Sequence, residues 1–237
     1  MLLEDVPLQI FADRCVQVCF VLFWGIFILS AFLAQSTTIW PDYAEQIMTA
    51  EFIEQLESMF ANEISGRSMN DDLAMAGFYI YNNTGIGLQC FAGGVLVVPG
   101  IYITVSNAAL LGASFGYMAR PDVAAGENFF HFVTAHGPFE LTAIVLAAGA
   151  GLRIGWSWVR TNGLTRPASL RKAGQESMPV MGASMVLFFL AALIEGFLSP
   201  SVVPYVLKAM VAIACSALLM VYFVVLVMPR SSRHAIR

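Results

Sequence analysis

Residues 15–34 read CVQVCFVLFWGIFILSAFLA, a run of twenty positions without a charged side chain. An α-helix of ~20 apolar residues crosses a hydrocarbon core about 30 Å thick, so this run predicts a membrane-spanning helix. It is too long and too bulky for a cleavable signal peptide, and no small-x-small cleavage motif follows it. We therefore expect it to remain in the protein as a membrane anchor.

The rest of the chain has the same apolar character. Of its 237 residues, 58% are hydrophobic and only 12% are charged, whereas about 25% of the residues of a soluble domain are charged. We predict an all-α fold, a polytopic membrane helical bundle of about six transmembrane helices that forms a single membrane domain over residues 1–237. The predicted spans cover residues 15–34, 73–98, 101–119, 132–159, 178–198 and 205–228.

Proline and glycine mark joints and close contacts between these spans. Pro99 and Gly100 predict a tight turn between the second and third spans, and the two spans could instead form a re-entrant element. The segments 112–116 (GASFG) and 151–155 (GLRIG) fit a small-xxx-small pattern. This pattern more often packs neighbouring spans of one chain than it builds a dimer.

Basic residues concentrate in the loop after the fourth predicted span and in the C-terminal tail. Cytoplasmic loops of membrane proteins are rich in Lys and Arg, so we expect a multi-pass protein of the bacterial inner membrane with both termini cytoplasmic and residues 35–72 outside. Membrane lipid is the expected surrounding, and no basic run favours nucleic acid as a partner. The residues that set this orientation are Arg160, Arg166, Arg171, Lys172, Arg230, Arg233 and Arg237.

The predicted outer segment contains one amphipathic stretch, residues 42–64. Its apolar stripe comprises Met48, Phe52, Leu56, Met59 and Phe60, and its polar face comprises Glu51, Glu54, Gln55, Ser58 and Asn62. The spacing predicts an extracytoplasmic helix. We interpret it first as a lid packed on the spans of its own chain, and second as a docking helix for an extracytoplasmic partner.

Four ionisable residues fall inside the predicted spans at a similar, outer depth: His136, Glu140, Glu195 and Lys208. A charged group in a membrane helix costs ~2.5–3.5 kcal/mol on insertion scales and usually faces the bundle interior. His136 and Glu140 are one helical turn apart. Lys208 could compensate either glutamate, or His136 and Glu140 could share a proton.

We interpret this group first as a polar clamp that fixes the packing of three spans. A proton relay, a notch for a polar headgroup or peptide, and a cation site remain alternatives. The spacing is not that of the His-Glu-x-x-His zinc helix, so we assign no metal. No cofactor-binding motif is present, and Arg153 is expected to reach the cytoplasmic interface without a chemical role. Asn82, Asn83 and Asn107 form a secondary polar group in the second and third spans.

Two strings and a residue pair carry a family resemblance. Residues 129–144 (FFHFVTAHGPFELTAI) contain a His-Gly-x-x-Glu signature that resembles that of the stage II sporulation protein M family. Residues 191–200 (AALIEGFLSP) are similar to the second signature of that family, and Asn82-Asn83 before a glycine-rich span resembles its paired asparagines. The resemblance covers about Met69 to the C-terminus.

The resemblance implies a multi-span membrane protein without established enzymatic activity. The sporulation member works with cell-wall hydrolases as their membrane scaffold, and many relatives are encoded beside a MoxR-type AAA+ ATPase. We therefore expect an integral membrane scaffold of the cell envelope, with cell-wall hydrolases or a MoxR-type AAA+ ATPase as partners. The sequence leaves three alternatives open: a homo-oligomer, a transporter or channel-like subunit with a polar cavity near the outer face, and an intramembrane enzyme that uses Glu140 as acid or base.

Overall fold

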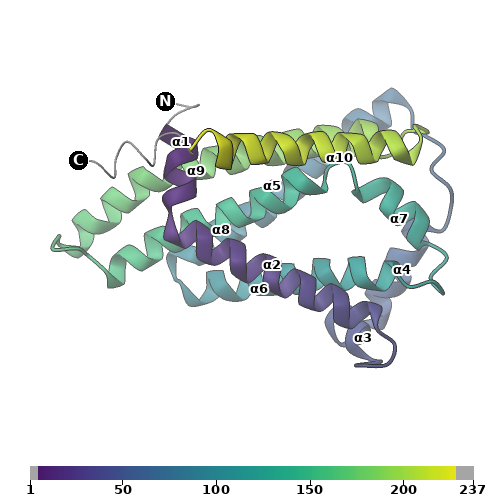
Figure 1. Ribbon diagram of the computed structural model, residues 1–237, viewed down its shortest axis with the longest axis horizontal. Coiled ribbons are helices and arrows are strands. Elements are labelled where there is room, and N and C mark those ends of the chain that lie inside the picture. The colour runs from purple at the N-terminus through teal and green to yellow at the C-terminus, as the bar shows by residue number, and fades with distance from the viewer. Residues whose placement is uncertain (1–4, 228–237) are drawn as a thin grey trace.

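The computed structural model describes residues 5–227, and this part of the chain is helical and contains no strand. Long helices form an elongated bundle, and three short ones, α3, α4 and α7, gather at one end of it (Figure 1). The elements are α1 (Asp5–Ala12), α2 (Arg14–Gln35), α3 (Tyr43–Met48), α4 (Ala50–Phe60), α5 (Met69–Val95), α6 (Val98–Met118), α7 (Gly126–Val133), α8 (Gly137–Val159), α9 (Arg166–Leu193), η1 (Ile194–Leu198), α10 (Tyr205–Met220) and η2 (Val221–Val225).

Five helical segments of the described chain are long and apolar enough to cross a membrane, which confirms the all-α polytopic bundle. They are Arg14–Gln35, Val98–Met118, Gly137–Val159, Arg166–Leu198 and Tyr205–Val225. The span expected at 73–98 lies in α5, whose 27 residues are long enough but which is not among the five. The expected end of the last span at Met228 and the basic tail residues Arg230, Arg233 and Arg237 lie outside the described residues.

Helix α8 occupies the centre of the bundle. In α8, 72% of the most apolar window is buried by the rest of the protein, whereas the corresponding value for the segment Tyr205–Val225 is 11%. Helices α2, α5 and α9 all pack against α8. A polar group on α8 therefore meets other helices, whereas most of α10 faces outward.

Glycines allow the closest helix contacts. A Cβ atom on Gly151 of α8 would lie 2.8 Å from the Cα atom of Phe91 on α5, and one on Gly116 of α6 would lie 2.8 Å from the Cα atom of Ala31 on α2. Gly112 and Gly155, the partners of these residues in the small-xxx-small segments, make equally close contacts with α2 and α5. Both segments therefore pack neighbouring helices of one chain.

The turn between α5 and α6 lies earlier than expected. Residues 96–97 form it, with Val97 at the unusual φ of 62°, and α6 already begins at Val98. Pro99 belongs to the first turn of α6, where a backbone N–H has no partner within the helix and its loss costs nothing. The prediction that Pro99 and Gly100 form the turn is therefore wrong.

The amphipathic segment is two helices and not one continuous helix over 42–64. Thr49, at φ 63°, ends α3 and caps α4, because its side-chain oxygen accepts a hydrogen bond from the backbone N–H of Phe52 at 3.3 Å. The break changes the direction of the following side chains, so Ile53 joins the buried face while Met59 is 71% exposed.

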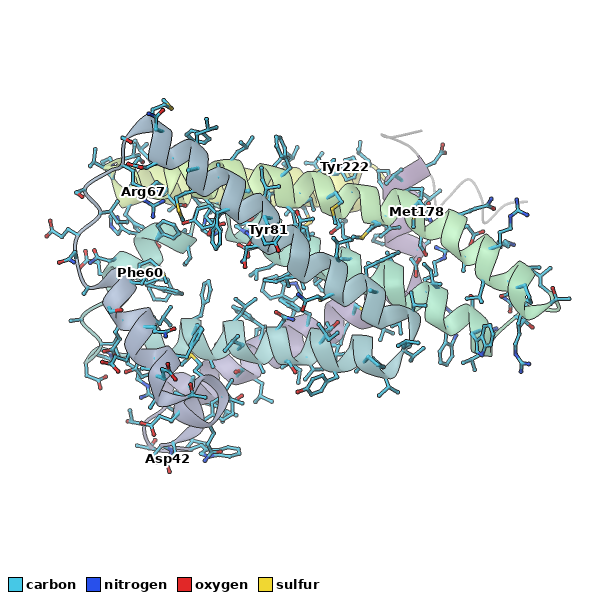
Figure 2. All side chains as sticks on the ribbon, turned by 180° about the vertical axis from the view of Figure 1, so that it is seen from behind. Asp42, Phe60, Arg67, Tyr81, Met178 and Tyr222 are labelled. Atoms are coloured by element: carbon cyan, nitrogen blue, oxygen red, sulfur yellow. The ribbon has the colours of Figure 1, made fainter. Side chains whose placement is uncertain are left out.

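Both short helices pack on the bundle of their own chain, as a lid would. The Tyr117 hydroxyl of α6 donates a hydrogen bond to Glu57 of α4 at 2.6 Å, and the ring of Phe60 meets that of Phe129 of α7 edge-on, with 5.3 Å between centroids. Figure 2 shows Phe60 at the same end of the bundle as Asp42 and Arg67. The exposed face of α4 carries Glu51 and Glu54.

Candidate functional site

The segment expected as one span over 132–159 is broken, and the break places His136. Helix α7 ends at Val133 and α8 begins at Gly137. Pro138 lies in the first turn of α8, where its fixed φ favours a helix start. The carbonyl of His136 accepts a hydrogen bond from the backbone N–H of Glu140 at 3.2 Å. His136 therefore caps α8, and Glu140 follows one turn later.

Glu195 is placed by an irregular turn at the end of α9. Residues 194–198 form the wider π-helical turn η1, in which the N–H of Ser199 bonds to the carbonyl of Ile194 at 2.9 Å. Gly196 lets η1 approach α5 closely, since a Cβ atom there would lie 2.6 Å from the Cβ atom of Ala76. The turn directs Glu195 and Ser199 towards the start of α8.

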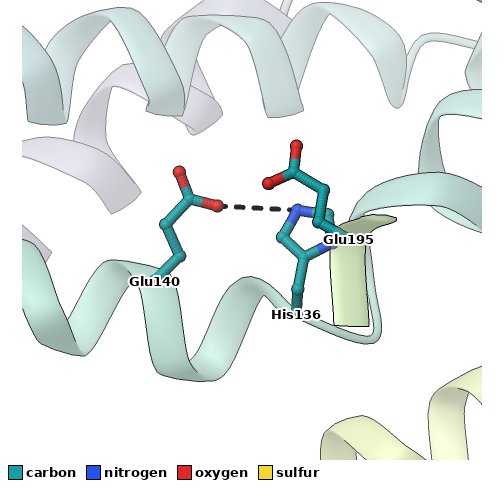
Figure 3. Close-up of side chains that lie close together, drawn as sticks. All are labelled: His136, Glu140 and Glu195. Atoms are coloured by element: carbon teal, nitrogen blue, oxygen red, sulfur yellow. Dashed lines mark ion pairs between the residues drawn. The ribbon is translucent and has the colours of Figure 1, made fainter. Parts of the chain in front are cut away.

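These two irregular segments bring His136, Glu140 and Glu195 together. One ligand atom from each side chain lies within 4.8 Å of the other two. The Nε2 atom of His136 is 3.5 Å from a carboxylate oxygen of Glu140, and Figure 3 shows both glutamates on the same side of the imidazole. His136 is 4% exposed and Glu195 9% exposed, and the side chain of Glu140 is 18% exposed.

Hydrogen bonds from outside this triad fix the orientation of its members. Asn83 of α5 donates from Nδ2 to Glu195 at 3.0 Å, and Asn82 donates to the Asn83 side-chain oxygen at 3.1 Å. The Nδ1 atom of His136 lies 3.0 Å from the Ser199 hydroxyl. The asparagine pair therefore belongs to the same polar group as the two glutamates.

Lys208 lies beside this group but does not pair with its carboxylates. The Lys208 side chain is fully buried, and its Nζ atom donates to the carbonyls of Ser199 at 2.7 Å and Ser201 at 2.9 Å. Among residues 5–227 it forms no salt bridge with Glu140 or Glu195. It acts on the site indirectly, because it holds the loop that carries Ser199.

Asn107 lies apart from the site. Its side chain donates to the carbonyl of Ile103 in its own helix at 2.9 Å. Sequence reasoning also gave no role to Ser199, although the residue ends the second signature string. A hydroxyl next to a proline at the end of a buried helix is a weak signal, and only the three-dimensional arrangement shows its contact with His136.

A second charged group, at the other end of α8, was missed as well. Arg153 forms salt bridges of 2.5 Å with Asp13, which precedes α2, and with Glu176 of α9. The interpretation that Arg153 simply reaches the interface is therefore wrong. The cost of a cation within a membrane helix is the signal that a partner was needed. A cavity of about 940 Å³ lies beside this group.

Two cavities are described for residues 5–227, and neither is lined by the triad. The larger one lies beside Arg153, and the smaller one, of about 400 Å³, lies between Glu63, His131 and the loop 201–204. The triad is thus a packed polar group that joins α5, α8 and η1. It offers two carboxylates and an imidazole as hydrogen-bonding, proton-binding or cation-binding groups.

Comparison with known proteins identifies one family. The family model for stage II sporulation protein M matches residues 18–200, which include both signature strings and all three triad residues. No curated protein and no solved structure matches the chain.

Proposed function

Because the chain belongs to the stage II sporulation protein M family, we propose that it is an integral membrane scaffold that organises partner proteins of the bacterial cell envelope. The partners that the family suggests are cell-wall hydrolases and a MoxR-type AAA+ ATPase. In this proposal the chain has no reaction of its own, and its helices hold a fixed surface in the membrane.

The observation that carries this proposal is the use of the polar residues inside the bundle. Asn83, His136, Glu140 and Glu195 bond to one another or to neighbouring helices, and neither described cavity reaches them. A transporter or channel subunit would need those side chains to line a polar path. The packing therefore favours the polar clamp over a transport route.

The surface that we propose for partner binding is the outer layer formed by α3, α4 and α7. Its apolar residues already pack on the bundle, so the layer does not need a partner in order to fold. Glu51 and Glu54 remain exposed on α4 and would attract a basic surface of an extracytoplasmic partner. This assignment places both termini in the cytoplasm, because Lys and Arg concentrate at the opposite end, in the α8–α9 loop and the start of α9.

Site-specific photo-crosslinking in cells tests the proposal. A photoreactive residue at Glu54 reports on the outer layer, and one at Val21 of α2, which is 70% exposed on an apolar helix, serves as the lipid-facing control. We expect Glu54 to capture an envelope hydrolase or a subunit of a AAA+ ATPase, and Val21 to capture neither. Recovery of the chain alone, or of another copy of it alone, at both positions would refute the scaffold role.

A further inference from the structure

The triad has the composition of a cation site. We propose that His136, Glu140 and Glu195 bind one divalent transition-metal ion, with Nε2 of His136 and one oxygen of each carboxylate as ligands. The three ligand atoms lie within 4.8 Å of one another and come from two elements, the start of α8 and the π turn η1. This proposal does not depend on the scaffold function.

Charge is the first argument. Two carboxylates face each other in a buried place, and one imidazole can supply at most a single positive charge. Lys208 is bonded to backbone carbonyls. Arg67 acts on Glu195 without forming a salt bridge, and its guanidinium lies 5.9 Å from the Phe132 ring centroid. A divalent cation balances both carboxylates and leaves the imidazole neutral, as a metal ligand must be.

The hydrogen bonds around the triad are the second argument. A metal-binding histidine usually uses its other ring nitrogen for a hydrogen bond that fixes the ring. In this protein Nδ1 of His136 is 3.0 Å from the Ser199 hydroxyl, so Nε2 is directed at the carboxylates. Glu195 is likewise oriented by Asn83. Both bonds arise from residues that would not themselves touch the ion.

Distance and access are the third argument. Ligand atoms about 2.1 Å from a tetrahedral ion lie about 3.4 Å from one another. The His136–Glu140 pair, at 3.5 Å, already meets this spacing, and the widest separation of 4.8 Å requires a closure of about 1.4 Å. Rotation of the flexible glutamate side chains covers that distance. The partial exposure of Glu140 gives the ion a way in, and water completes the coordination.

The donor types select the class of ion. Imidazole nitrogen combined with carboxylate oxygen suits Zn²⁺, Mn²⁺ or Fe²⁺, whereas Mg²⁺ and Ca²⁺ prefer oxygen ligands alone. The four cysteines are not part of the group. A bound ion would tie η1 to the start of α8 and so hold the outer ends of α8 and α9 together.

The experiment measures Zn²⁺ binding by the full chain, purified in lipid nanodiscs and stripped with a chelator. We expect one ion per chain that survives excess Mg²⁺. His136→Ala or Glu195→Gln should weaken binding more than ~100-fold, and Asn83→Ala should weaken it ~10–100-fold, the usual effect of losing a residue that orients a ligand. The controls His131→Ala and Glu127→Gln, both on α7, should bind as the unchanged protein does.

Two results would overturn the proposal: a monodisperse unchanged protein that takes up no stoichiometric Zn²⁺, or binding that persists in His136→Ala and Glu195→Gln. Because these variants can fail to fold, Co²⁺ provides a readout on the unchanged protein. Visible absorption bands without a thiolate charge-transfer band are expected for nitrogen and oxygen ligands. A thiolate band would place the ion at cysteines and refute the assignment.

Discussion

The contact between α5 and α8 gives the sharpest stability prediction. A Cβ atom on Gly151 would lie 2.8 Å from the Cα atom of Phe91, whereas ordinary contacts begin at 3.4 Å. Gly151→Ala therefore requires α5 to move away by at least about 0.6 Å. Overpacking of this kind costs about 1–3 kcal/mol, and we expect a loss of that size in the free energy of unfolding.

Gly182→Ala on α9 is the matched control, because a Cβ atom there meets nothing within 4 Å. Alanine is the better helix former by up to about 1 kcal/mol, so this change should be neutral or stabilising. Denaturant unfolding in mixed micelles, followed by circular dichroism, measures both variants. Equal stability of Gly151→Ala and Gly182→Ala would show that helix α5 does not pack against Gly151 as described.

Two further predictions concern other contacts. Arg153→Met removes the cation between Asp13 and Glu176 and should lower the unfolding free energy by about 2–3 kcal/mol. This is below the ~3–5 kcal/mol typical of a broken buried pair, because the Glu176 side chain is 41% exposed; an unfolding midpoint unchanged from that of the original protein would argue against a structural role. Tyr117→Phe deletes the hydrogen bond to Glu57 and should cost about 1 kcal/mol, seen as faster amide hydrogen exchange in α4 but not in α8, while equal exchange in α4 of both proteins would contradict it.

Much of the fold could be predicted from hydropathy because long apolar runs have few structural alternatives in a membrane. The runs at 15–34, 101–119 and 205–228 each correspond to a helix within the described residues. The joints were predicted less well. Thr49 and Val97 adopt positive φ values that packing imposes on residues with no local preference for them, and no periodicity signals such a break.

The site was partly visible in the sequence. Membrane insertion makes every intramembrane charge costly, and this alone singled out His136, Glu140, Glu195 and Lys208. Which of them meet could not be deduced, because partner choice depends on the π turn of η1 and on the direction in which Lys208 leaves α10. A lysine that bonds two carbonyls and a lysine that pairs with a glutamate look identical in a sequence.

The π turn at residues 194–198 has a consequence for how this protein can change. Such a turn holds one more residue than the α-helical turn it replaces. Deleting one residue between Glu195 and Ser199 would restore ordinary helix and rotate Ser199 by about 100° relative to Glu195. The hydroxyl would then lose His136, and the loop carbonyls would lose Lys208. In this segment the number of residues matters as much as their identity, so the chain should tolerate many substitutions there before it tolerates one deletion.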